Sequence, residues 1–117
     1  MLLTVFERLL LRNIVPQIQG WNYAHMKEAR ELIEGLFTEQ EESDLQFEQE
    51  GTQVKWKIAK ENGESIPQER DIPISDGLKA KIGKFLKQLD REEKLGMEHY
   101  TLYTKFIETE SLAPKQG

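Results

Sequence analysis

The amino-acid sequence predicts an α+β fold, and three observations lead to this class. Apolar residues recur with the period of a helix before residue 38 and again after residue 75, but they alternate with polar residues around the middle of the chain. The chain has 117 residues, which is the size of one domain. Cysteine is absent, so no disulfide supports the fold. We therefore expect about four helices packed with a small antiparallel sheet, in the order α-α-(short α)-β-β-β-α-α.

Two capping boxes mark helices in the first third of the chain. In this motif, to which Thr4 with Glu7 and Thr38 with Glu41 conform, each side chain bonds to the backbone N–H of the other residue. The first box begins a helix that runs to about residue 12, and the second begins a short helical turn. Between them, apolar spacing predicts another helix. The side chains that these patterns predict to be buried are Val5, Phe6, Leu9, Leu10, Met26, Ala29, Ile33, Leu36 and Phe37.

The strongest local prediction is a central β-hairpin around Gly51. Apolar and polar residues alternate on both sides of this glycine, which accepts the backbone conformation of a tight turn. The register that gives the best side-chain pairs sets Phe47 opposite Trp56 and Glu48 opposite Lys55. One face then carries an apolar pair and the other an ion pair, and each pair contributes about 0.2–1 kcal/mol.

A third strand is expected near residues 70–74, after a turn at Asn62 and Gly63. Proline has no backbone N–H, so Pro67 and Pro73 place this strand at the edge of the hairpin's sheet.

Two more helices follow the predicted strands. The first, over residues 76–94, has the most regular apolar stripe in the chain, and the second runs from about residue 97 to 108. Residues 1–108 are therefore expected to form a single domain, and the polar residues 109–117 a flexible tail.

Charge is distributed unevenly along the chain, whose net charge is -5. Residues 28–50 hold nine acids and one base, whereas residues 75–94 hold six bases and four acids. The basic side chains of the helix at 76–94 are the candidate phosphate-facing residues: Lys79, Lys81, Lys84, Lys87 and Arg91. No aromatic residue is interleaved with them on the outer side of the helix to stack on a base, and the overall charge is negative. Nucleic-acid binding is thus a disfavoured alternative, and a solvated lysine face is the more common explanation.

A winged-helix DNA-binding layout is the form that this alternative would take. Its order of helices followed by a hairpin matches the one predicted here. However, the segment that would read the groove, residues 31–44, is acidic and has no Lys or Arg, so phosphates would repel it. Any contact with nucleic acid would have to use the lysine face instead.

The connection between the first two long helices is unusually apolar. It contains Ile18, Trp21 and Tyr23, which are the candidate partner-binding residues, because Trp and Tyr dominate protein interfaces. The alternative is that Trp21 folds back as a lid on the core.

No catalytic apparatus is recognisable, and we expect no enzymatic activity, cofactor or metal. The motifs of phosphate-binding loops and of nucleophile elbows are absent from the sequence. His25 and Glu28 are spaced to share a metal ion, but a third ligand is missing. His99, the other histidine, is expected to have a structural role.

Several segments together resemble small bacteriophage- and prophage-encoded proteins of unknown function. They are E-R-L-x-L-x-x-I-x-P at 7–16, F-T-E-x-E at 37–41, V-x-W at 54–56 and the ending L-D-x-E-x-K-L…Y-x-K-F-I at 89–107. The resemblance covers most of the chain but carries no functional residue, because its motifs are caps, turns and core. It implies an accessory protein in a bacterial cytoplasm.

These observations favour a non-enzymatic protein that acts by binding another protein, whose identity the sequence does not give. The chain has no apolar stretch of the roughly 20 residues that cross a bilayer, so we expect no membrane contact. Either a monomer or a homodimer is compatible with the sequence.

Overall fold

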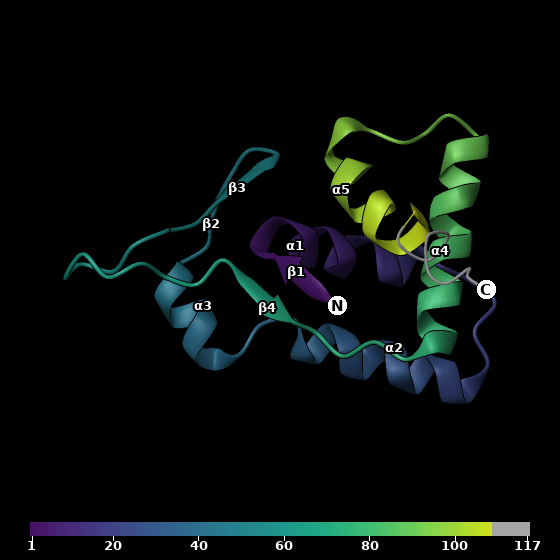
Figure 1. Cartoon of the computed structure of the whole chain (residues 1–117), viewed down its shortest axis with the longest axis horizontal. Helices are drawn as coiled ribbons and strands as arrows, with labels where there is room; N and C mark the ends of the chain where they lie inside the picture. The colour runs from purple at the N-terminus through teal and green to yellow at the C-terminus, as the bar shows by residue number, and fades with distance from the viewer. Residues whose placement is uncertain (109–117) are drawn as a thin grey trace.

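The computed structural model describes residues 1–108, and it confirms the α+β class (Figure 1). Five α-helices and four short strands are joined by turns of 3₁₀- and π-helix. The flexible tail predicted for residues 109–117 lies outside the described residues. In chain order the elements are β1 (Leu2–Thr4), α1 (Val5–Ile14), the 3₁₀-helix η1 (Val15–Gln17), α2 (Tyr23–Gly35), α3 (Glu39–Leu45), β2 (Glu48–Glu50), β3 (Gln53–Lys55), β4 (Glu69–Asp71), α4 (Asp76–Arg91), the 3₁₀-helix η2 (Met97–His99), α5 (Tyr100–Tyr103) and the π-helix η3 (Thr104–Glu108).

The third strand does not join the hairpin, contrary to the sequence-based prediction. Strand β4 instead pairs antiparallel with β1, which sets Leu3 opposite Arg70, and β2 and β3 form a separate two-stranded sheet. The backbone N–H of Ile72 donates to the carbonyl of Met1 at 2.8 Å and extends this ladder. Strand β1 lies directly before α1 and ends at the capping residue Thr4. The sequence pattern there indicates the start of a helix and gives no sign of a strand.

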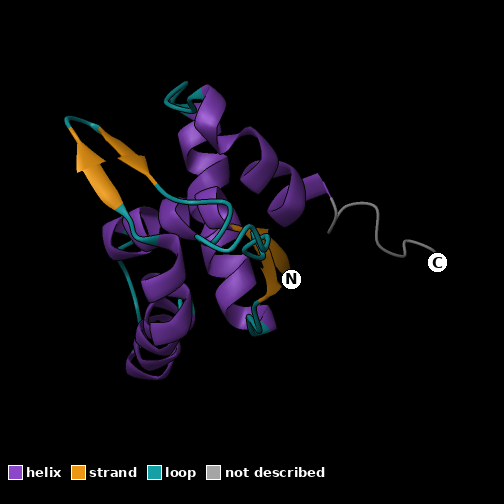
Figure 2. Ribbon diagram, turned by 90° about the vertical axis from the view of Figure 1, so that its left-hand side faces the viewer, coloured by secondary structure: helices purple, strands orange, loops and turns teal. Residues whose placement is uncertain are grey.

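The predicted hairpin register is confirmed, although its ion pair differs. Glu48 lies opposite Lys55, and the rings of Phe47 and Trp56 meet edge to face with their centroids 6.3 Å apart. The ammonium of Lys55, however, binds the carboxylate of Glu50 at 2.9 Å, diagonally across the strands. The two strands stand away from the helices as an arm (Figure 2). We call β2, β3 and their turn, residues 48–55, the hairpin arm.

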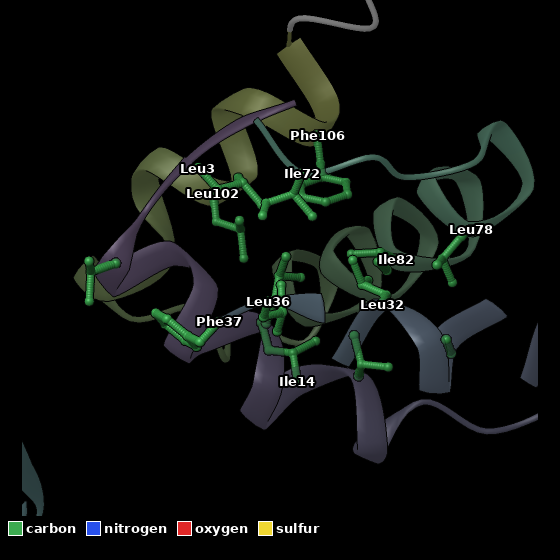
Figure 3. Packing of buried hydrophobic residues seen from close by; sticks show 14 of the residues in the cluster. Leu3, Ile14, Leu32, Leu36, Phe37, Ile72, Leu78, Ile82, Leu102 and Phe106 are labelled. Atoms are coloured by element: carbon green, nitrogen blue, oxygen red, sulfur yellow. The ribbon is translucent and has the colours of Figure 1, made fainter. Parts of the chain in front are cut away.

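The buried apolar side chains form one cluster between the helices and β1 (Figure 3). Leu3 of β1 packs there with side chains from α1, α2, α4 and the C-terminal helical segment. The stripe predicted for α4 is confirmed, because Leu78, Ile82 and Leu86 are buried. Gly83 lets the C-terminal segment approach α4 closely, since a Cβ at this position would lie 3.3 Å from Ile107 Cδ1.

The burial predicted for α1 and α2 is partly wrong. Leu11 and Ile14 are the residues of α1 that enter the core, together with Val5, whereas Phe6 remains 43% exposed. On α2, Ala29 and Leu32 are buried, and Met26 is half exposed. Apolar residues on α1 occupy more than one face of the helix, so periodicity alone did not select the face that packs inward.

Two buried charges on α1 tie distant segments together. Glu7 accepts from the ammonium of Lys105 at 2.7 Å and caps its own helix through the Thr4 N–H. Burial raises the pKa of Glu7, but the hydrogen bonds from Lys105 and Thr4 lower it by more. The net result is a pKa below the ordinary value of a glutamate. The neighbouring Arg8 donates to the carbonyls of Leu36 and Gln68 and to the carboxylate of Glu41, and its guanidinium stacks 4.6 Å from the centroid of the Phe37 ring.

Candidate functional site

A large surface depression lies between α1 and the hairpin arm. Its volume is about 900 Å³. We call it the arm groove, and Figure 1 shows the elements that border it, namely α1, the hairpin arm and the segment before α5. The lining residues are Phe6, Leu9, Leu10, Arg12 and Asn13 of α1, Gln49, Thr52, Gln53, Val54 and Trp56 of the arm and its base, and Glu98 of η2.

The floor of the arm groove is an apolar stripe on α1. Phe6, Leu9 and Leu10 have the i, i+3, i+4 spacing with which one helix packs against another, and the polar Asn13 at i+7 ends the stripe. These are largely the residues that the sequence assigned to the core, but Phe6 is exposed and both leucines are half-buried. Helix α1 therefore has one apolar face in the core and a second one that faces the groove.

The wall formed by the hairpin arm and its base carries two apolar side chains, Val54 and Trp56, beside the polar Gln49, Thr52 and Gln53. Side chains alternate along a strand, so Val54 projects from the same face as Trp56, while Lys55 projects from the opposite face. Trp56 is held in place by an indole N–H that donates to the side-chain oxygen of Gln68 at 2.9 Å. The strands themselves are short and mostly exposed. A two-stranded hairpin is marginally stable alone, so this wall is incompletely supported.

Charge is sparse around the arm groove. Arg12 and Glu98 are its only charged lining residues in the described structure, and they come from different elements. Polar amides surround the apolar centre, from Asn13, Gln49 and Gln53. Beside Glu98, Met97 is 86% exposed and Tyr100 is also exposed, which extends the apolar surface at that rim. The groove thus has an apolar centre and a polar rim, as protein interfaces do.

The predicted partner-binding residues do not form a common exposed patch. Ile18 is only 7% exposed and belongs to the core, whereas Tyr23 is 80% exposed at the start of α2. Trp21 is half-buried against the core, and the ammonium of Lys81 lies 5.4 Å from its ring centroid. Trp21 therefore lies against the core, as the lid alternative expects. Of the three predicted residues, Tyr23 alone has a largely exposed side chain.

The predicted phosphate-facing residues belong to α4, but their side chains lie on different faces of the helix. At about 100° per residue, Lys79 and Lys81 differ by about 200° around the helix. Both are half-buried, whereas Lys84, Lys87 and Arg91 are exposed on its outer side. The ammonium of Lys81 donates to the carbonyl of Gly20 at 2.5 Å. Gly20 has a φ of 83°, a left-handed conformation that glycine adopts readily.

Both histidines and Glu28 contact neighbouring structural elements. The imidazole of His25 packs beside Gly77, so that a Cβ there would lie 3.0 Å from its Nε2. The carboxylate of Glu28 accepts from the Ser75 hydroxyl at 2.9 Å, and His99 Nδ1 accepts from the backbone N–H of Gly96 at 2.8 Å. Within residues 1–108 no group of three or more His, Asp or Glu side chains is placed to hold a metal ion.

The sequence did not indicate the arm groove, because its residues read as core of α1 and as one face of the hairpin. One signal was available: α1 has more apolar side chains than a single face of a ten-residue helix accommodates.

None of the helices described is long and apolar enough to cross a membrane. Comparisons with protein-family models, with curated proteins and with solved structures give no match to this chain.

Proposed function

We propose that this chain is a non-enzymatic, phage-type accessory protein that binds an amphipathic helix of a protein partner in the arm groove. The observation that supports the proposal is the second apolar face of α1 beside an arm whose strands are mostly exposed. A bacterial cytoplasm would be the setting, following the resemblance to phage-encoded proteins.

A helix is the occupant that the groove favours. The floor stripe has the spacing of a helix–helix contact, and a helix laid on it would also cover the apolar face of the arm. Such a partner would bury Phe6 and Val54, which the chain alone leaves accessible to solvent. A patch of this kind, rimmed by polar residues, is typical of an interaction site.

The rim charges define the expected sequence of the partner helix. An acidic side chain of the partner would lie beside Arg12, and a basic one beside Glu98. The centre of the groove has no charge, so the partner's buried face would consist of apolar residues. The acidic exterior of α2 and α3 would remain outside the contact.

Photo-crosslinking from within the groove tests this proposal. A benzoylphenylalanine in place of Phe6 should crosslink a protein from bacterial lysate, identified by mass spectrometry. The additional substitution Leu10→Glu should abolish that product, because a carboxylate would be buried without a partner. The same probe at Tyr23, on exposed α2, is the matched control and should not give it. An identical product from both probe positions, or a product that survives Leu10→Glu, would contradict the proposal.

A further inference from the structure

A cleft with positive charge lies between the segment after α1 and the outer side of α4, away from the arm groove. Its volume is about 430 Å³, and its lining contains no acidic residue although the protein's net charge is -5. The lining residues are Gln17, Ile18, Gln19, Lys81, Lys84, Phe85 and Gln88. The local charge therefore favours an anionic ligand.

The two lysines of this cleft differ in availability. Lys84 is exposed, and its ammonium has no hydrogen-bond or ion-pair partner in the described part of the chain. The ammonium of Lys81 is held by the Gly20 carbonyl, so it contributes charge from a fixed position. Of the other polar lining groups, the Gln88 amide donates to the carboxylate of Glu92, the residue that follows α4, at 3.1 Å. Lys84 is thus the free cation of the cleft.

Two aromatic rings lie beside these cations, one from α4 itself and one from a distant part of the chain. Phe85 lines the cleft and is half-buried. The ring of Trp21 is not part of the lining but lies next to it, with the ammonium of Lys81 5.4 Å from its centroid. Trp21 is 60 residues away from Lys81 in the chain, so only the fold brings it to α4. Cations next to partly exposed rings are the combination with which proteins bind single strands of nucleic acid.

We propose that this cleft binds single-stranded nucleic acid. Lys84 binds the phosphates, Lys81 adds attraction from its fixed position, and the rings of Phe85 and Trp21 contact unpaired bases. A duplex hides its bases inside the stack and offers only phosphates. The site therefore prefers a single strand, and it is independent of helix binding in the arm groove.

Fluorescence anisotropy with a short fluorescein-labelled oligothymidylate tests the site on the full chain. At low ionic strength the oligonucleotide should bind, and log K should fall with log salt with a slope of about -1.4, as expected for two phosphate contacts. An unlabelled duplex of the same length should compete less well than the unlabelled single strand. Inorganic phosphate and thymidine monophosphate should compete only at far higher concentration.

Substitutions separate this cleft from general electrostatic attraction. Lys84→Gln should weaken binding and make the slope shallower by about 0.7. Lys57→Gln removes one positive charge from an exposed position outside the cleft, and it should leave affinity unchanged. The proposal would be overturned by absence of binding at low ionic strength, by equal weakening in both variants, or by equal competition from the duplex. Displacement by inorganic phosphate as effective as by the oligonucleotide would also overturn it.

Discussion

The guanidinium of Arg8 is fully buried and lies 2.8 Å from the carboxylate of Glu41, which is 33 residues further along the chain. Arg8 belongs to α1, and Glu41 is the third residue of α3, where it also completes the capping box with Thr38. Arg70 of strand β4 donates from its Nε to both oxygens of the same carboxylate, at 3.1 and 3.2 Å. One carboxylate therefore links α1, α3 and β4.

Replacing Arg8 with methionine should strongly destabilise the protein. The carboxylate of Glu41 and the carbonyls of Leu36 and Gln68 would each lose a donor, and breaking a buried ion pair from one side costs about 3–5 kcal/mol. Urea denaturation measures this loss. Arg30→Met is the matched control, because Arg30 forms an exposed ion pair with Glu34, and it should cost about 0.5 kcal/mol or less. Equal effects of the two substitutions would contradict the structural role of Arg8.

Acid should destabilise the fold through Glu41. Burial raises its pKa, but hydrogen bonds from the Thr38 N–H, Arg8 and Arg70 lower it more, to about 2 from 4.5. A depressed pKa in the folded state gives stability that is present above pH 4.5 and is lost as the pH falls toward 2. The contribution is about 3 kcal/mol.

Chemical denaturation between pH 7 and pH 2.5 measures the effect of this carboxyl group. In the Glu41→Gln variant the free energy of unfolding should be lower at pH 7 and should depend less on pH between 4.5 and 2.5. If the variant shows the same acid dependence as the parent, Glu41 is not the group responsible.

Two apolar residues of α1 should differ sharply in their importance for stability. Leu11→Ala leaves a cavity in the core and should cost about 2–5 kcal/mol, because Leu11 is fully buried. Phe6→Ala removes a side chain from the floor of the arm groove, and it should cost about 1 kcal/mol or less. Urea denaturation of both variants decides between the two positions. A larger loss for Phe6→Ala would mean that this ring belongs to the core.

The pairing of β1 with β4 is testable with an engineered disulfide. Leu2 lies opposite Asp71 in a pair that exchanges no backbone hydrogen bonds, where Cα atoms are about 4.5 Å apart and within the range of a disulfide. The natural chain has no cysteine, so Leu2→Cys with Asp71→Cys should give one intramolecular bond on oxidation, detected by mass spectrometry.

The control for this disulfide follows from the arrangement that the sequence suggested. Gln53→Cys with Asp71→Cys places one thiol on the hairpin and one on β4, which would be neighbours only if β4 extended the hairpin's sheet. This pair should remain reduced. If this pair oxidised rapidly while cysteines at positions 2 and 71 did not, the three-stranded sheet predicted from the sequence would be the correct arrangement.

The elements predicted well from the sequence are those that local interactions determine. The capping boxes at Thr4 and Thr38 form within four residues, and the register around Gly51 follows from its turn and from adjacent side chains. The stripe of α4 is regular enough to indicate its buried face without knowledge of its neighbours.

What the sequence did not reveal depends on contacts between distant segments. Strand β1 exists because β4 lies beside it, and its own three residues form no pattern. The exposed position of Phe6 follows from the packing of β1 and of the C-terminal segment, which use the other faces of α1. The approach of Trp21 to Lys81 likewise arises from tertiary folding, so the basic cleft and its aromatic neighbour were not apparent together.

The pairing of β1 with β4 has a consequence for synthesis on the ribosome. Residues 2–4 must wait for residues 69–71 before they have a partner, and at about 5–20 residues per second this takes roughly 3–13 s. During that interval α1 is exposed on both apolar faces, and Arg8 lacks its acceptors at Glu41 and Gln68. Helix α1 of the nascent chain therefore gains its full set of tertiary contacts only after the strand that closes the fold has been made.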